Sequence, residues 1–270
     1  MTLGEAMAFA RAKIDRLDAR LLLQYATGCT HADLLARPET PVIGPAYDQF
    51  AEWVARRAAG EPLAYLVGEA EFCGRIFQVS PAVLIPRPET EVLIDLALEK
   101  MRRLAAPKVV DLGTGSGIVA ISLALEFPQA AVATVDLSAE AIAVARNNAG
   151  RLGAKVDFYE GDWLAPLAGQ RFDLIVSNPP YVAAGDPHLA LNGLPHEPQM
   201  ALSDGADGLE CIRSIVAAAP AHLNPGGWLL FEHGYDQGEA SRNLLTAAGF
   251  KAASTFPDLA GIDRVSGAHL

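Results

Sequence analysis

The residues best placed to do chemistry are Ser177-Asn178-Pro179-Pro180-Tyr181, which directly follow the apolar residues 172–176. The apolar run predicts a buried strand, and the prolines end it because proline cannot continue a hydrogen-bonded ladder. The residue before each proline is held extended, which fixes the direction of the Asn178 carboxamide. The loop therefore suits a planar group that bears an NH2, although a simple proline-rich turn would have the same sequence.

A glycine-rich turn lies upstream, between a strand predicted at residues 109–112 and a helix predicted to begin near Ile118. Its glycines let a ligand approach the backbone, and the helix N-terminus offers free N–H groups. The GxGxG spacing differs from the GxGxxG of pyrophosphate sites, and no Lys or Arg accompanies it as in a phosphate loop. A nucleoside without phosphate fits better. The residues of the turn are Gly113, Thr114, Gly115, Ser116 and Gly117.

Two further positions complete a nucleoside site. Asp136 ends the next predicted strand, where an acidic side chain can accept both ribose hydroxyls, or it caps the helix before Ser138. In Gly161-Asp162-Trp163 the carboxylate could accept from an exocyclic amine, and the indole could pack on a purine or in the core. Together with the Asn-Pro-Pro-Tyr loop, these residues make S-adenosylmethionine the leading cofactor candidate.

Composition excludes several classes of protein. The 270 residues are 51% hydrophobic and 20% charged, as in a soluble globular protein, and the net charge of −11 argues against binding nucleic acid through its backbone charge. We find no apolar run long enough for a membrane span and no signal peptide, so a cytoplasmic protein is expected. Cys29, Cys73 and Cys211 are scattered and predict free thiols, with no metal site.

The order of predicted elements divides the chain into a helical domain at residues 1–67, a hairpin linker at 68–84 and a catalytic domain at 85–270. Helix caps are predicted at Thr2, Asp15 and Thr30, and the hairpin is predicted to turn near Cys73-Gly74. From Lys108 onward, strands alternate with helices, which indicates a mainly parallel sheet covered on both faces.

Four segments around the catalytic domain carry separate expectations. Residues 85–91 are expected to form a rigid wall of the site that leads into a helix from about residue 88 to 104. Residues 224–227 are expected to be the turn that opens a strand at 228–232. Residues 182–207 are too long for an ordinary connection and are expected to be a loop that closes over the site, or a disordered insertion.

These motifs resemble the S-adenosylmethionine-dependent amino-methyltransferases. Further segments narrow the resemblance to the protein-(glutamine-N5) methyltransferases of peptide chain release factors, the HemK/PrmC family. Two small departures, His196 before Glu-Pro and Ser203, concern only the substrate loop. The matching segments are residues 111–117, 136 and 178–181, and then 86–91, 161–163, 197–198, 201–202, 207–209, 224–227, 232–234 and 258–264.

The resemblance implies an α/β fold, a Rossmann-like seven-stranded sheet whose last strand is antiparallel, with a small helical bundle before it. It also implies that the substrate is the Gln of a Gly-Gly-Gln loop on the release factor. Residues 1–67 themselves carry no catalytic motif and are expected to be a docking module or a lid. Residues 113–117, Asp136 and Trp163 would contact the cofactor. Asn178, Pro179, Pro180 and Tyr181 would hold the substrate amide, with Asn178 near both ligands.

A carboxamide nitrogen is a poor nucleophile because its lone pair is delocalised, so the enzyme mainly has to orient it. We expect the Asn178 side-chain oxygen and the Pro179 carbonyl to accept the two amide hydrogens, with Tyr181 beside the Gln stem. Proton loss can follow transfer, so His188 and His196 are candidates only if a base is required.

Two other functions remain open. A DNA or RNA amino-methyltransferase could use the same loop, but the acidic balance and the lack of a basic, aromatic-rich segment for base flipping disfavour it. A cofactor-binding protein that has lost catalysis is also compatible, although the intact loop at residues 178–181 disfavours it.

Overall fold

The structure, a computed structural model, describes residues 1–191 and 193–270. The chain divides into two compact units, each described here by itself. The first comprises Met1–Glu69 with Ala190–His196, and the second comprises Ala70–Leu189 with Glu197–Leu270. Within the stretch at 182–207, Asn192 lies outside the described residues.

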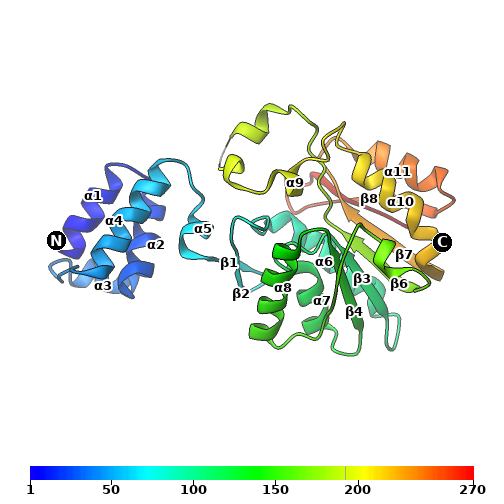
Figure 1. Ribbon diagram of the computed structural model, residues 1–270, viewed down its shortest axis with the longest axis horizontal. Helices are drawn as coiled ribbons and strands as arrows, with labels where there is room; N and C mark the ends of the chain where they lie inside the picture. The colour runs from blue at the N-terminus through cyan, green and yellow to red at the C-terminus, as the bar shows by residue number, and fades with distance from the viewer. Residues whose placement is uncertain (192) are drawn as a thin grey trace. The chain divides into compact units, whose positions relative to one another are not determined.

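The first unit is a bundle of short helices (Figure 1, blue to cyan). The predicted caps are confirmed: Thr2 Oγ1 accepts from Glu5 N at 3.3 Å, and Asp15 Oδ1 accepts from Leu17 N at 2.7 Å. Thr30 likewise forms a capping box with Asp33. The core of the bundle includes Leu3, Leu22, Leu23, Phe50, Val54 and Leu66. The helices are α1 (Leu3–Arg11), α2 (Arg16–Thr27), α3 (His31–Ala36), α4 (Pro45–Ala58) and α5 (Leu63–Val67), with a 3₁₀ turn η4 (Leu194–His196).

The predicted hairpin is also confirmed. Strands β1 (Glu69–Phe72) and β2 (Arg75–Gln78) pair as a two-stranded sheet. Cys73 and Gly74 both have positive φ, at 47° and 69°, as a two-residue hairpin turn requires.

A seven-stranded sheet forms the middle of the second unit (Figure 1). Its strand order is β5-β4-β3-β6-β7-β9-β8. Strands β3 to β7 are parallel to one another, whereas β9 is antiparallel to both β7 and β8, as the family resemblance implied. The strands are β3 (Lys108–Leu112), β4 (Ala131–Asp136), β5 (Asp157–Glu160), β6 (Phe172–Ser177), β7 (Leu223–Glu232), β8 (Lys251–Pro257) and β9 (Asp263–His269).

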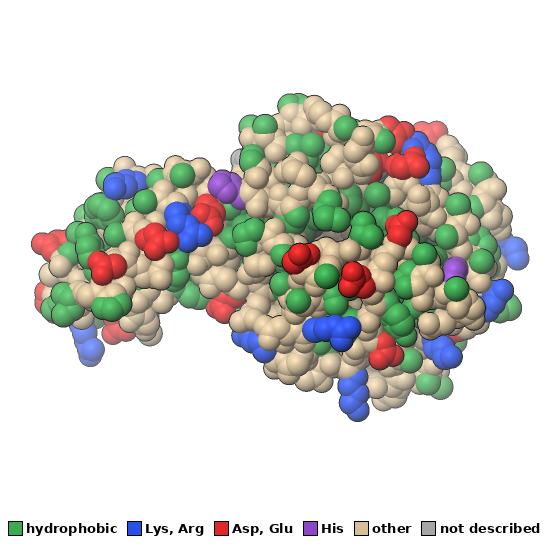
Figure 2. All heavy atoms as spheres, viewed as in Figure 1, with side chains coloured by type: hydrophobic (Ala, Val, Ile, Leu, Met, Phe, Trp, Pro, Cys, Tyr) green, Lys and Arg blue, Asp and Glu red, His purple; other side chains and the backbone are tan. Residues whose placement is uncertain are grey.

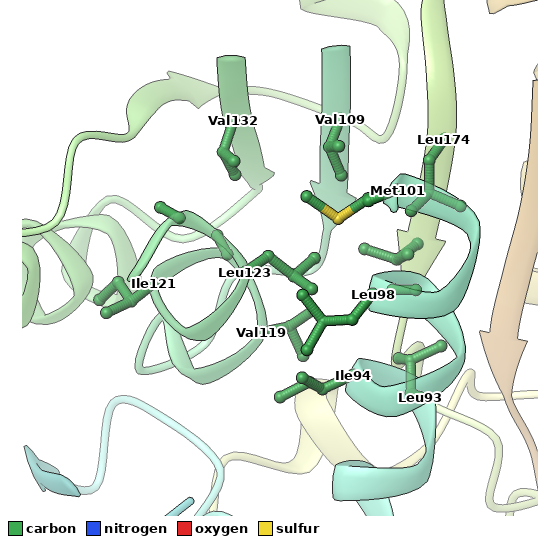
Figure 3. Packing of buried hydrophobic residues seen from close by; sticks show 14 of the residues in the cluster. Leu93, Ile94, Leu98, Met101, Val109, Val119, Ile121, Leu123, Val132 and Leu174 are labelled. Carbon is green, nitrogen blue, oxygen red and sulfur yellow. The ribbon is translucent and has the colours of Figure 1, made fainter. Parts of the chain in front are cut away.

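Helices cover both faces of this sheet. On one face, side chains of α6 (Glu91–Met101) and α7 (Ile118–Glu126) interdigitate above Val109, Val132 and Leu174 of three strands (Figure 3). Helix α8 (Ala139–Leu152) adds Ala149 to the same core. On the other face, α10 (Glu210–His222) and α11 (Gly238–Ala247) bury Ile212, Ile215 and Leu245.

The short elements are η1 (Pro88–Thr90), η2 (Ala165–Leu167), η3 (Pro187–Ala190) and α9 (Gln199–Leu202). The last two lie in the stretch at 182–207, which therefore contains ordered turns rather than a wholly disordered insertion. Val182 also forms an isolated bridge with Ser203.

Two sequence-based boundaries were wrong. The helix predicted at 88–104 begins as η1 and ends at Met101, because the prolines at 86 and 88 delay a regular α-helix. Residues 224–227 are part of β7 rather than a turn before it. Asn224 Nδ2 donates to Asp173 Oδ1 at 2.7 Å, and the register shift between Phe172 and Leu174 accommodates Pro225 in the strand.

On the face shown in Figure 2, Lys and Arg side chains are scattered among Asp and Glu. No helix within the described residues is both long enough and apolar enough to cross a bilayer.

Candidate active site

A cavity of about 330 Å³ lies in the second unit, where β3, β4 and β6 end. Parallel strands direct their carboxyl ends to one edge, and ligands of open α/β sheets bind there. Of the wall predicted at 85–91, residues 85–87 and Thr90 line the cavity. The predicted site residues that line it are Gly113, Thr114, Gly115, Ser116, Asp136, Trp163, Asn178 and Pro180.

The glycine turn is joined to Asp136 by a backbone hydrogen bond. Gly115, with φ at 53°, donates its N–H to Asp136 Oδ2 at 2.9 Å, and Ser138 N donates to Oδ1 at 2.9 Å. Ser138, not Asp136, caps α8, since its side chain accepts from Ala141 N. Burial raises the pKa of Asp136, opposed by these backbone N–H groups. Both carboxylate oxygens keep a lone pair, so Asp136 can still accept from ligand hydroxyls.

Trp163 is held at the edge of the same turn. Gly161 N donates to Asp136 O at 3.0 Å, and Pro166 packs so closely that a Cβ on Gly161 would lie 3.0 Å from its Cγ. Trp163 itself has a φ of 43°, which is strained for a large side chain. Its half-buried indole lines the cavity and packs on the core below, so the core-packing interpretation is confirmed and the purine contact stays a prediction.

Beyond the end of β6, Asn178 and Tyr181 are both linked to one buried carboxylate, Tyr181 directly and Asn178 through Thr90. Asn178 Nδ2 donates to Thr90 Oγ1 at 3.1 Å, and Thr90 Oγ1 donates to Glu232 Oε2 at 2.7 Å. Tyr181 Oη donates to Glu232 Oε1 at 3.1 Å. Burial raises the pKa of Glu232 to about 7, although both hydrogen bonds lower it. Burial and the Glu232 charge also raise the pKa of Tyr181 well above its usual range.

The sequence placed Thr90 in the expected wall at residues 85–91 but predicted no individual role for Thr90 or Glu232. A signal existed for Glu232: β6 and β7 are parallel neighbours that pair Ser177 with Phe231, which places Glu232 beside Asn178. No comparable signal linked Thr90 to Glu232, because η1 is far from both strands in the sequence.

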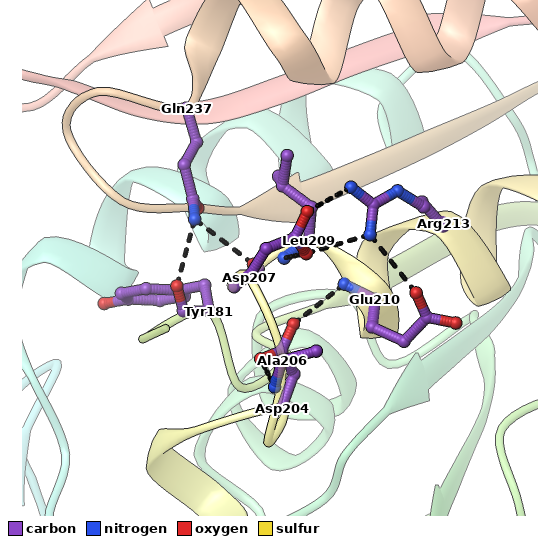
Figure 4. Close-up of polar contacts among 9 residues, drawn as sticks. Tyr181, Asp204, Ala206, Asp207, Leu209, Glu210, Arg213 and Gln237 are labelled. Carbon is purple, nitrogen blue, oxygen red and sulfur yellow. Dashed lines mark hydrogen bonds and ion pairs between the residues drawn. The ribbon is translucent and has the colours of Figure 1, made fainter. Parts of the chain in front are cut away.

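A second set of hydrogen bonds fixes the backbone of this loop (Figure 4). Gln237 Nε2 donates to the carbonyls of Tyr181, at 3.0 Å, and of Gly208, at 3.2 Å. Gly208 must be glycine here, since it has a φ of 85° and a Cβ would lie 2.6 Å from Tyr181 O. Arg213 donates to Asp207 at 2.9 Å on the exposed side of the same turn. The Tyr181 carbonyl is therefore held from the N-terminus of α11, where Gln237 is the N-cap residue.

A buried ion pair supports the wall of the cavity. Arg87 Nη2 donates to Glu197 Oε1 at 2.5 Å, and Ile85 N donates to Glu197 Oε2 at 3.0 Å. The Glu197 carboxylate is buried, so it depends on these donors for its charge to be tolerated.

Three predicted residues are not among the residues that line the cavity: Gly117, Pro179 and Tyr181. Gly117 has a packing reason to be glycine, because a Cβ there would lie 2.7 Å from Ile121 Cδ1 and 3.1 Å from Ala145 Cβ. His188 is exposed and pairs with Asp186 at 2.7 Å. The ligand contacts predicted for Gly117, Pro179 and Tyr181 stay predictions.

The cavity suits a nucleoside that carries positive charge. Asp136, Asp162 and Asp204 line it, whereas the charge of its Arg87 is matched by Glu197. Its size lies in the range of small-molecule pockets, and Val119 and Leu137 give it apolar walls. S-adenosylmethionine has ribose hydroxyls, a purine, an ammonium group and a sulfonium, so the residues present fit it.

The family comparisons agree with this geometry. Residues 90–194 match the Methyltransferase small domain, and residues 5–68 match the PrmC N-terminal domain. A release factor glutamine methyltransferase from Bordetella pertussis is 51% identical, over 95% of this chain and 96% of its own length. One from Neisseria gonorrhoeae is 46% identical, over 98% and 97%.

Solved structures agree on the fold. A methyltransferase from Pyrococcus furiosus superposes with a TM-score of 0.54 at 18% identity, covering 81% of this chain and 98% of that one. The 16S rRNA N2 G1207 methyltransferase of Thermus thermophilus gives 0.56 at 22% identity, covering 74% and 49%. At these identities the likeness concerns the methyltransferase fold alone.

Proposed function

The chain belongs to the release factor glutamine methyltransferase family, and on this basis we propose that it methylates the side-chain amide nitrogen of the Gln in the Gly-Gly-Gln loop of peptide chain release factors. Similarity over nearly the full length of its relatives is the observation that carries the proposal. The position of Asn178 at the wall of the cavity supports it.

We assign the cofactor side to the ends of β3, β4 and β5. Asp136 would accept the ribose hydroxyls, residues 113–117 would lie against the amino-acid part, and Trp163 would pack on the purine. S-adenosylmethionine supplies an electrophilic methyl group on its sulfonium when it is bound. The contacts of Asp136 with Gly115 and Ser138 support this assignment, because they hold the carboxylate at the cavity.

We assign the substrate side to the loop after β6. Asn178 Oδ1 and the Pro179 carbonyl would accept the two hydrogens of the glutamine amide, and Pro180 and Tyr181 would flank its stem. Accepting both hydrogens favours a pyramidal nitrogen and stabilises the transition state more than the ground state. Orientation of this kind can lower a barrier by about 7–11 kcal/mol in favourable cases.

The partner is accordingly a protein, and we place residues 1–67 in its docking, residues 68–84 in a linker and residues 85–270 in the methyltransferase domain. The match of residues 5–68 to the PrmC N-terminal domain supports the first assignment. Release factors work in the cytoplasm, so we place the enzyme there, and we propose no direct contact with nucleic acid.

One assay tests the proposal against its alternatives. Labelled S-adenosylmethionine is supplied with a release factor, with duplex DNA or RNA, or with neither. We expect label on the release factor alone, and none on a matched release factor whose Gly-Gly-Gln glutamine is replaced by alanine. Label on nucleic acid alone would support the amino-methyltransferase alternative, and cofactor binding without any transfer would support a protein that has lost catalysis.

A further inference from the structure

Glu232 is a buried carboxylate at the end of β7 that the proposed chemistry does not use. Its side chain is 1% exposed, and it accepts from both Thr90 and Tyr181. It is not among the residues that line the cavity, whereas its partner Thr90 is. A buried charge is costly unless it is hydrogen-bonded, so a carboxylate held here by only two neutral hydroxyl groups needs a reason.

The hydrogen bonds around Thr90 run in one direction only. A hydroxyl has a single hydrogen, and Thr90 gives it to Glu232 Oε2. Its oxygen can then only accept from Asn178, which must turn its amide nitrogen toward Thr90. The Asn178 oxygen is the atom left over for another partner.

This direction matters because a carboxamide can rotate by half a turn without changing shape. If the Thr90 hydrogen pointed at Asn178 instead, Asn178 would turn its oxygen to Thr90 and its NH2 away from it. The NH2 group of a substrate amide would then face the NH2 group of Asn178, and two donors cannot form a hydrogen bond with each other. The orientation of the Asn178 carboxamide therefore depends on Glu232, the group that accepts the Thr90 hydrogen.

We infer that Glu232, as a carboxylate, is a positioning residue that acts through Thr90 to keep the Asn178 oxygen available for the glutamine amide. The inference rests on the proposed function. The same carboxylate holds Tyr181, so both side chains of the substrate loop depend on one buried group. No proton passes between Glu232 and the substrate.

The charge state of Glu232 then sets the direction of the hydrogen bonds. Burial raises its pKa to about 7; Thr90, Tyr181 and Arg264 oppose the rise, and Glu89 adds to it. The ring nitrogens of the neighbouring His233 form hydrogen bonds with Ser266 Oγ and Gly234 O, not with Glu232. Once protonated, Glu232 has a hydrogen to give, and the Thr90 hydroxyl is free to point at Asn178. Activity should fall as the pH falls through about 7.

Paired substitutions at residue 90 test the inference. Thr90→Val keeps the shape but removes the acceptor, whereas Thr90→Ser restores it. We expect kcat for methyl transfer to a release factor to fall about 100-fold in Thr90→Val, the cost of a misplaced contact, and to be largely recovered in Thr90→Ser. The KM for the release factor and the Kd for S-adenosylmethionine should change less than about threefold. The remote substitution Thr246→Val, on the exposed face of α11, is the matched control.

A pH profile provides the second measurement. In the unsubstituted enzyme, log kcat should decline below about pH 7 with a slope approaching one, while cofactor affinity stays flat. Glu232→Gln should remove this decline and lower kcat at high pH. Retention of the acid decline in Glu232→Gln would overturn the inference.

Folding failures and functional failures are separable. Equal kcat values in Thr90→Val and Thr90→Ser, or loss of cofactor binding in both, would overturn the inference and leave Glu232 and Thr90 with a purely structural role. If Glu232→Gln does not fold, the comparison of kcat between Thr90→Val and Thr90→Ser still tests the inference. If the unsubstituted enzyme transfers no methyl to any release factor, the proposed function itself fails.

Discussion

On one side of the cavity, at the ends of β3 and β4, Asp136 binds backbone N–H groups of the glycine turn and of Ser138 directly. On the other side, at the ends of β6 and β7, Asn178 and Tyr181 are held through side chains that lead to Glu232. The first side depends on backbone conformation, and the second depends on the placement of hydrogens. Substitutions should therefore affect cofactor affinity and stability on the first side, and kcat on the second.

The largest effect is expected at Asn178. Asn178→Ala removes the amide acceptor proposed for the substrate, so kcat should fall about 100- to 1000-fold, as when a preorganised hydrogen-bonding group is removed from an active site. The Kd for S-adenosylmethionine, measured by calorimetry, should change only a few-fold. If cofactor affinity collapsed instead, Asn178 would belong to the cofactor side, and the distinction between the two sides would be lost.

Gly117 should carry the largest stability effect on the backbone-built side. In Gly117→Ala, the new Cβ meets Ile121 and Ala145 while the backbone keeps a φ of 87°, so the free energy of unfolding should fall by about 3 kcal/mol. Urea denaturation measures this change. Gly115→Ala is the matched comparison, since its Cβ meets nothing within 4 Å and only the backbone cost of about 1–2 kcal/mol remains. Equal losses would mean that packing at Gly117 is loose.

The side-chain-built side should also make stability depend on pH. Folding raises the pKa of Glu232 from 4.5 to about 7, so the folded state binds the proton more tightly than the unfolded state. Stability contributed by the protonated group is therefore full below about pH 4.5 and is lost as the pH rises to 7, by about 3 kcal/mol. Thermal unfolding across this range should show a smaller loss in Glu232→Gln. An unchanged slope would mean that Glu232 does not titrate there.

The smallest effect is expected at Asp136. Asp136→Asn keeps one acceptor oxygen but faces one backbone N–H with an NH2 group, and it removes a negative charge from the cavity. The Kd for S-adenosylmethionine should rise about 10- to 100-fold, the cost of one charged hydrogen bond, while kcat at saturating cofactor changes little. A kcat loss without a change in Kd would move Asp136 to the substrate side.

The difference between the two sides also explains what the sequence could predict. The cofactor side is local: a strand, a glycine turn and a helix follow one another, and Asp136 ends the adjacent strand. Its elements and residues could therefore be read in order. The wider architecture, including the antiparallel β9, came from the family resemblance rather than from these patterns.

The substrate side could be predicted only in part. The loop at 178–181 was visible because proline has a strong local effect. Thr90 and Glu232 are 142 positions apart, and nothing in their own neighbourhoods indicates that they meet. The prediction of a turn at residues 224–227 was also wrong because of a contact between distant residues. Asp173 on the adjacent strand holds Asn224 in the sheet, although residues 224–227 have a turn-like sequence.

The place of β9 in the sheet has a consequence for how the protein is made. Strand β8 precedes β9 in the chain but joins the sheet only through it. During synthesis on the ribosome, α11 and β8 emerge before β9. Until β9 follows, β8 has no strand to pair with and one edge of β7 is unpaired, and unpaired strand edges promote aggregation. Arg264, whose charge acts on Glu232, arrives only with β9. The surroundings of the buried carboxylate are therefore complete only when the last strand of the sheet is in place.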